Sequence, residues 1–167
     1  MSETAAFESD ADALGDVLRR RGWRLAAAES CTGGLIAAAC TAPAGASDWF
    51  ERGFVTYSNA AKCELLGVPA DMIEQHGAVS AEVARAMATG ALANSHAQLA
   101  VAVTGIAGPA GGTPGKPVGT VWLALARRGV AAQAELLQLR GDRAGIRAQT
   151  VQCALARLRE WAADREV

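Results

Sequence analysis

The residues best suited to chemistry lie in one turn, residues 28–34, with the sequence AESCTGG. An apolar run enters this turn and another leaves it, which is typical of a buried strand that feeds a helix. Ser30 then lies at the carboxyl end of the strand, and Gly33 and Gly34 leave backbone N–H groups at the start of the helix. Such donors bind a phosphate or the oxyanion of an acyl-transfer intermediate. The alternative is an ordinary strand–helix turn with Ser30 or Thr32 as its cap.

Lys62 is the candidate proton acceptor for Ser30. The sixteen basic residues comprise fourteen arginines and two lysines, Lys62 and Lys116. Lysine can lose its proton when desolvated and act as a base, whereas arginine effectively cannot. Ser58 is expected to cap a helix that carries Lys62 one turn inside it, and the shared edge of a parallel sheet brings the lysine within reach of Ser30. A solvated surface lysine is the alternative.

Four further side chains flank this pair in the sequence. Tyr57 is expected to position the lysine or to donate to the substrate, and Asn59 to orient the reacting groups. Cys31 is a rival nucleophile without an obvious histidine partner. Glu29 is placed to tune Lys62, although a carboxylate favours the protonated amine and works against a base role.

A glycine-rich segment, residues 105–117, follows a predicted strand that ends at Thr104. It holds five glycines and three prolines and begins at Gly105. A shaped loop of this length permits close ligand approach and is expected to cover a nucleotide or sugar-phosphate. It is not a Walker A loop, because Pro117 stands where that motif requires Ser or Thr. Arg143 is expected to pair with a phosphate, with a solvated or subunit-interface position as the alternative.

Alternating helices and strands position these residues. Predicted helices cover residues 11–21, 33–40, 58–66, 69–75 and 80–95, with a closing helix after Asp142. Predicted strands cover residues 23–29, 50–57, 99–104, 118–126 and 131–139, the last two joined as a hairpin. This order predicts an α/β fold, a three-layer α/β/α domain with a mixed, mostly parallel sheet. We expect a flexible N-terminal tail over residues 1–9 and a single domain over residues 10–165.

The length, net charge and residue composition of the chain argue against several classes of protein. A chain of 167 residues is most simply one domain, and its net charge of −1 gives no electrostatic support for a nucleic-acid partner. No apolar stretch reaches membrane-spanning length, and residues 1–16 lack the features of a secretion signal. Four scattered cysteines and two histidines argue against a structural zinc site and favour the reducing cytoplasm.

Six short motifs occur in one order: AESCTGG (28–34), YSNAAK (57–62), GAVS (77–80), VTGIAGP (103–109), KPVGT (116–120) and GDR (141–143). Together they resemble the CinA C-terminal domain family, which includes nicotinamide-nucleotide amidohydrolases. The resemblance covers roughly residues 10–162. Larger members of the family carry a further N-terminal domain associated with nucleotide pyrophosphatase activity, and we do not expect that activity here.

The resemblance implies deamidation of nicotinamide mononucleotide to nicotinate mononucleotide and ammonia. It implies a serine amidohydrolase mechanism that needs no metal and no cofactor, in a homodimer or higher homo-oligomer. Ser30 would attack the carboxamide and Lys62 would accept its proton. The expected substrate contacts are Glu29, Cys31, Thr32, Gly33, Gly34, Asn59, Thr104, Gly105 and Arg143. Two alternatives stay open: an amidohydrolase for another small amide, and a non-catalytic module that binds a nucleotide or a partner.

Overall fold

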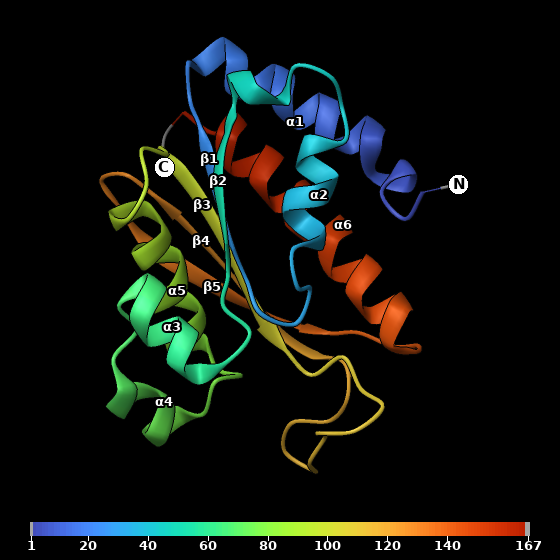
Figure 1. Cartoon of the computed structure of the whole chain (residues 1–167), viewed down its shortest axis with the longest axis vertical. Helices are drawn as coiled ribbons and strands as arrows, with labels where there is room; N and C mark the ends of the chain where they lie inside the picture. The colour runs from blue at the N-terminus through green and yellow to red at the C-terminus, as the bar shows by residue number, and fades with distance from the viewer. Residues whose placement is uncertain (1, 166–167) are drawn as a thin grey trace.

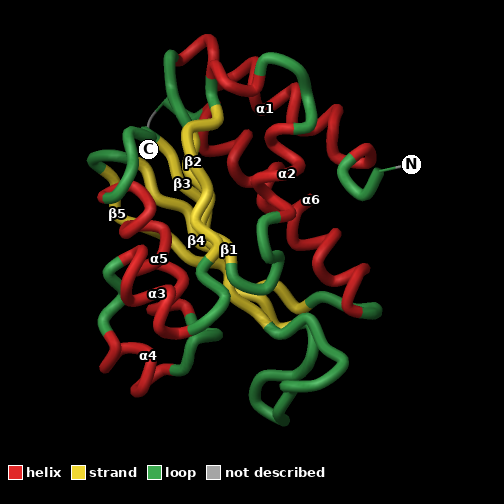
Figure 2. Tube along the Cα trace, viewed as in Figure 1, coloured by secondary structure: helices red, strands yellow, loops and turns green. Residues whose placement is uncertain are grey.

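The computed structural model describes residues 2–165, which form a five-stranded sheet between two layers of helices (Figures 1 and 2). The strands are β1 (Leu25–Glu29), β2 (Phe50–Val55), β3 (Leu99–Gly105), β4 (Thr120–Arg127) and β5 (Val130–Gln138). The α-helices are α1 (Glu8–Arg21), α2 (Leu35–Thr41), α3 (Asn59–Leu66), α4 (Ala70–His76), α5 (Ala81–Ala93) and α6 (Arg143–Ala163). Short 3-10 turns cover Ala5–Phe7 and Ala46–Asp48.

The sheet has the order β2-β1-β3-β4-β5. Strand β1 pairs in parallel with β2 and with β3, whereas β4 is antiparallel to both β3 and β5. The predicted α/β/α fold with a mixed sheet is confirmed, with parallel and antiparallel pairings in equal number. The carboxyl ends of β2, β1 and β3 meet at one edge, which is where open α/β sheets bind ligands.

The two faces of the sheet carry side chains of different size. Leucine and valine face α1, α2 and α6, which lie together on one side in Figure 1. Buried alanines face α5 on the other side, at Ala26, Ala28, Ala100, Ala102, Ala124 and Ala126. These small side chains allow α5 to pack close to the sheet. Helix α5 also packs closely against α3, because a Cβ at Gly90 would clash with the carbonyl oxygen of Leu66.

The N-terminal segment differs from the predicted tail over residues 1–9. Residue 1 lies outside the described residues, but helix α1 already begins at Glu8, and Phe7 is 2% exposed within the core. Burial of this aromatic side chain fixes the segment against the domain.

Two predicted boundaries moved, both next to glycines with positive φ. Gly22 takes a φ of 63° and ends α1 as predicted, but the N–H of Trp23 still donates to the carbonyl of Leu18 at 2.9 Å, and β1 starts at Leu25 instead of residue 23. Gly33 and Gly34 have φ values of 58° and 106°, which a right-handed helix does not accommodate, so α2 starts at Leu35. Within residues 2–165, no helix has the length and apolar character that a membrane span requires.

Candidate active site

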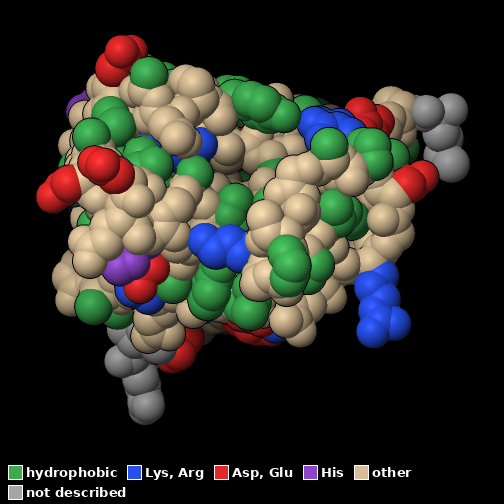
Figure 3. Space-filling model, turned by 90° about the horizontal axis from the view of Figure 1, so that it is seen from below, with side chains coloured by type: hydrophobic (Ala, Val, Ile, Leu, Met, Phe, Trp, Pro, Cys, Tyr) green, Lys and Arg blue, Asp and Glu red, His purple; other side chains and the backbone are tan. Residues whose placement is uncertain are grey.

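A pocket of about 210 Å³ lies at the carboxyl edge of β1 and β3. Figure 3 looks onto this edge of the molecule, where a single patch of basic side-chain surface lies near the centre of the face and other basic side chains are scattered around it. The pocket is lined by Ser30, Cys31, Tyr57, Asn59, Lys62, Ala78, Val79, Thr104, Gly105, Ala107 and Arg143. Eight of these residues belong to the set that the sequence predicts.

Ser30 and Lys62 meet at the floor of this pocket. Lys62 Nζ lies 3.0 Å from Ser30 Oγ. Ser30 directly follows β1, and its N–H donates to the carbonyl of Val103 at 3.0 Å, which ties the serine to β3. Lys62 comes from the first turn of α3, where the Ser58 hydroxyl accepts a hydrogen bond from the N–H of Ala61, as the predicted cap requires. The exposed fractions are 8% for Ser30 and 1% for Lys62.

The surroundings of Lys62 suit a neutral amine. Its Nζ also lies 2.9 Å from the carbonyl oxygen of Thr56 and 3.3 Å from that of Tyr57. Burial lowers the pKa of Lys62. A neutral amine has two N–H donors and one lone pair. The two carbonyls can take both donors, which leaves the lone pair facing the Ser30 hydroxyl.

Glu29 faces away from Lys62 and does not line the pocket, contrary to its predicted place among the substrate contacts. Its Oε1 accepts from the Thr32 hydroxyl at 2.6 Å and from the N–H of Ile36 at 2.7 Å. Its Oε2 accepts from the N–H of Ala37 at 3.0 Å. The carboxylate therefore caps the start of α2, where the helix dipole stabilises negative charge.

This capping corrects the prediction of an open anion site at the start of α2. The N–H of Gly33 donates to the carbonyl of Ser30 at 3.0 Å, and Glu29 occupies the N–H groups of Ile36 and Ala37. Thr32 is fully buried. Thr32, Gly33 and Gly34 thus support the turn from outside the pocket. Among the four expected oxyanion donors, residues 31–34, Cys31 alone lies on the pocket wall.

The thiol of Cys31 is a poor rival to Ser30. Burial raises its pKa to about 12, so at neutral pH it stays protonated. A thiol reacts as its thiolate, and none of the residues lining the pocket is a histidine that could deprotonate it.

The opposite wall is held by side chains that bond to loop carbonyls. The Thr104 hydroxyl donates to the carbonyl of Ala78 at 2.9 Å. Arg143 Nη1 donates to the carbonyl of Gly108 at 2.9 Å, and its Nη2 donates to the phenol oxygen of Tyr57. One guanidinium therefore joins the glycine-rich segment to the entrance of α3.

Three wall residues were not singled out from the sequence: Ala78, Val79 and Ala107. Each has a small or apolar side chain without a polar or ionisable group that would indicate a role in the site. The signal that could have found them is the motifs quoted above, because Ala78 and Val79 belong to GAVS (77–80) and Ala107 belongs to VTGIAGP (103–109). Residues 78 and 79 also immediately precede the Ser80 cap of α5.

Three helices begin at this pocket, and their positive ends face it. Ser58, Ser80 and Asp142 cap α3, α5 and α6 as predicted, each accepting a backbone N–H. Arg143, at the start of α6, supplies positive charge on the pocket wall, which favours a negatively charged ligand. Across residues 2–165, no group of three or more His, Cys, Asp or Glu side chains is arranged to hold a metal ion.

Comparison of the sequence and the structure with those of known proteins identifies the family of this chain. The model of the CinA C-terminal domain matches residues 8–162. The nicotinamide-nucleotide amidohydrolase PncC of Enterobacter agglomerans is 50% identical over 162 residues, covering 96% of this chain and 98% of that protein. PncC of Pseudomonas putida is 56% identical over 142 residues, covering 85% and 88%.

A solved structure shares the fold closely. The competence damage-inducible protein A of Klebsiella pneumoniae superposes with a TM-score of 0.91 at 40% identity, covering 96% of this chain and 99% of that one. Other curated relatives are longer, and the chain spans 37% of the length of two of them.

Proposed function

Because the chain belongs to the CinA C-terminal domain family, we propose that it hydrolyses nicotinamide mononucleotide to nicotinate mononucleotide and ammonia. Two relatives that it matches over most of their length are named nicotinamide-nucleotide amidohydrolases. The observation that carries the mechanism is the 3.0 Å separation of Lys62 Nζ from Ser30 Oγ inside a pocket.

Acylation begins with the Ser30 hydroxyl and the neutral amine of Lys62. As Ser30 Oγ bonds to the carboxamide carbon, its proton moves to Lys62 Nζ and the carbonyl electron pair moves to the oxygen. The N–H of Cys31 is the donor we assign to this oxyanion, a contribution of roughly 3 kcal/mol in hydrolases. The C–N bond then breaks, and the departing nitrogen takes the proton from Lys62 to leave as ammonia.

Deacylation repeats these steps with water. Lys62, neutral again, accepts a proton from the water that attacks the acyl carbon. Collapse of the second tetrahedral intermediate breaks the bond to Ser30 Oγ, and Lys62 returns the proton to the serine. The acid leaves and the enzyme is restored, so atoms and protons balance without a further reagent.

The rest of the pocket is assigned to substrate binding. Arg143 supplies the positive charge for the phosphate of the nucleotide. Thr104 and Gly105 face the pyridine and ribose, while Tyr57 and Asn59 orient the reacting groups at the start of α3. The homodimer or higher homo-oligomer and the cytoplasmic location stay predictions.

The test is ammonia release from nicotinamide mononucleotide, with the acid product identified by chromatography. Wild type is measured with and without a chelator, beside Ser30→Ala and Lys62→Arg. Loss of the nucleophile or of the base should lower kcat by roughly a thousandfold or more, as in other hydrolases whose nucleophile–base unit is broken. Chelation should leave the wild-type rate unchanged.

Lys116→Arg is the matched control for Lys62→Arg. Lys116 is the other lysine. It donates to the carbonyl of His76 at 3.0 Å and is not among the residues that line the pocket. This variant should keep most of the activity. A well-folded wild type that releases no ammonia from this nucleotide would overturn the substrate assignment.

A further inference from the structure

We propose that Glu29 is a positioning residue for Ser30, because its carboxylate holds the turn that carries the nucleophile against the start of α2. This inference rests on the function proposed above. It adds a residue that acts through Ser30 without touching the substrate.

Glu29 is bound as a structural anion. Its side chain is 1% exposed and accepts three hydrogen bonds, from the Thr32 hydroxyl and from the N–H groups of Ile36 and Ala37. A carboxylate that accepts charge-assisted bonds from two successive helix N–H groups is fixed in both distance and direction. The side chain is thus anchored to α2 at its far end.

The main chain of Glu29 is equally fixed at the near end. As the last residue of β1, it pairs with Val55 of β2 and Val103 of β3. The turn formed by residues 30–35 therefore begins at the fixed end of β1 and ends at the start of α2, and the Glu29 side chain links these two ends. Ser30 is the first residue of this enclosed turn, so the Glu29 clamp limits where Ser30 Oγ can point.

Glu29 is also connected to the support of Lys62. Its carbonyl accepts from the N–H of Thr56 at 2.8 Å, and the carbonyl of Thr56 accepts from Lys62 Nζ at 2.9 Å. Glu29 therefore holds the turn that carries Ser30 through its side chain, and it holds Thr56, a hydrogen-bond partner of Lys62, through its backbone carbonyl. Substitution removes the first connection and leaves the second.

Two other roles for Glu29 do not fit the geometry. It does not line the pocket, so it does not contact the substrate. Its carboxylate is bound at the start of α2, and burial of the lysine itself lowers the pKa of Lys62. A positioning role predicts loss of rate without a shift in the pH at which the base titrates.

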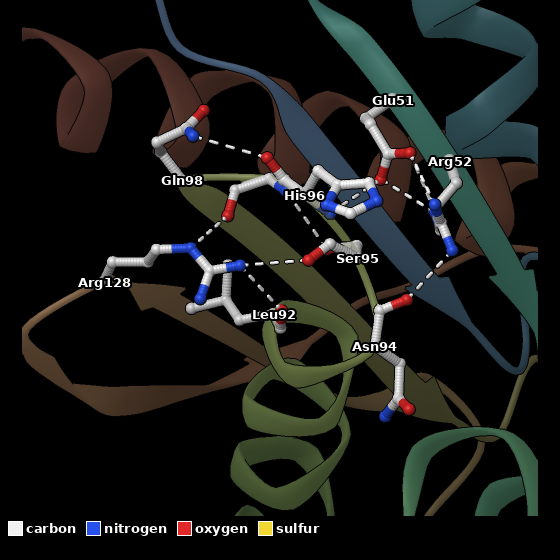
Figure 4. Close-up of polar contacts among 9 residues, drawn as sticks. Glu51, Arg52, Leu92, Asn94, Ser95, His96, Gln98 and Arg128 are labelled. Carbon is white, nitrogen blue, oxygen red and sulfur yellow. Dashed lines mark hydrogen bonds and ion pairs between the residues drawn. The ribbon is translucent and has the colours of Figure 1, made fainter.

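The experiment uses Glu29→Gln and Thr32→Val, with Glu51→Gln as the matched control. The glutamine removes the charge and replaces one acceptor oxygen by a donor, whereas valine removes only the hydroxyl that donates to Glu29. Glu51 is a largely buried carboxylate at the opposite end of the sheet, where it accepts from the N–H of His96 and from Arg52 (Figure 4).

Steady-state rates for nicotinamide mononucleotide are measured across pH on folded protein, together with thermal unfolding. Glu29→Gln should lower kcat by roughly tenfold to a hundredfold, because small displacements of a nucleophile have effects of this size. KM and the pH of half-maximal kcat/KM should stay near wild type. Thr32→Val should lower kcat in the same direction by less, and Glu51→Gln should lower stability while leaving kcat unchanged.

A second readout separates this inference from the substrate assignment. The rate at which a small sulfonyl fluoride labels Ser30, located by mass spectrometry, depends on the serine–lysine pair and not on the nucleotide. A wild type that is labelled but does not turn over the nucleotide would overturn the function alone. Glu29→Gln and Thr32→Val that are labelled as fast as wild type would overturn the positioning role. The positioning role would also be overturned if Glu51→Gln lowered kcat as much as Glu29→Gln does, or if Glu29→Gln shifted the pH of half-maximal kcat/KM.

Discussion

Arg143 Nη2 donates a hydrogen bond to the phenol oxygen of Tyr57, 3.2 Å away, although 86 residues separate the two in sequence. The other arm of the same guanidinium donates to the carbonyl of Gly108. Tyr57 is 61% exposed, so this contact lies at the mouth of the pocket. It places a positive charge where an anionic substrate enters.

Arg143→Lys should weaken substrate binding more than turnover. Lysine keeps the charge but cannot reach Gly108 and Tyr57 together, because it lacks the planar fork of arginine. We expect KM to rise roughly tenfold, the equivalent of about 1.5 kcal/mol of charged hydrogen bonding. Arg140→Lys, at an exposed arginine outside the pocket wall, is the control in the same steady-state assay and should leave KM unchanged.

Tyr57→Phe tests whether the contact itself matters. The single variant should raise KM, and the double variant with Arg143→Lys should be less impaired than the product of the two effects, because both remove one shared bond. Effects on KM that simply multiply would show that Tyr57 and Arg143 act independently.

The rate should rise with pH as Lys62 loses its proton. Only the neutral amine accepts the proton of Ser30, so activity is low below the pKa of Lys62 and high above it. Burial lowers this pKa from 10.5, and the rise should therefore fall below that value in a profile of kcat/KM against pH. A limb at or above the pKa of an ordinary lysine would contradict the proposed base.

Cys31 should be unreactive and dispensable for the chemical step. Because burial raises its pKa to about 12, iodoacetamide at neutral pH should leave Cys31 unmodified while it alkylates the half-buried Cys63. Peptide mass spectrometry of the folded protein measures both. Cys31→Ala should retain turnover that Ser30→Ala loses. Equal losses in the two folded variants would return Cys31 to consideration as nucleophile.

Gly90→Ala should destabilise the fold through overpacking. An added Cβ would clash with the carbonyl oxygen of Leu66, which belongs to backbone and cannot swing away. We expect a loss of about 1–3 kcal/mol in the free energy of unfolding, measured by chemical denaturation. Gly115→Ala is the control, since a Cβ there meets no atom within 4 Å and should leave stability nearly unchanged.

The serine–lysine pair was predictable because Ser30 directly follows one strand and Lys62 lies in the first turn of the helix that follows the neighbouring strand. Ser30 follows an apolar run and Lys62 follows a recognisable cap, Ser58, so the shared edge of a parallel sheet brings them together. The same reasoning located Thr104, at the end of β3. The two residues could be predicted to lie close together because strand direction and the helix cap at Ser58 together bring them to the same edge of the sheet.

The orientation of Glu29 was not predictable in this way. Its side chain lies on the face of β1 that Leu25 and Ala27 share, and that α2 covers this face is a tertiary property that no local sequence pattern states. Its partners are backbone N–H groups of Ile36 and Ala37, and backbone donors carry no signature in the sequence. The hydrogen bond of 2.9 Å that Arg147 donates to the carbonyl of Thr32 could not be predicted for the same reason, because its acceptor is a backbone group.

The alanines that line one face of the sheet have a consequence at the other end of α5. This helix rests on Ala100, Ala102 and their neighbours, and its first turn follows Ala78 and Val79, which form a wall of the pocket. The size of the side chains between α5 and the sheet thus contributes to the distance between this wall of the pocket and Ser30. We expect a larger residue at one of these alanines to push α5 outward and so to move the wall of the candidate pocket formed by Ala78 and Val79.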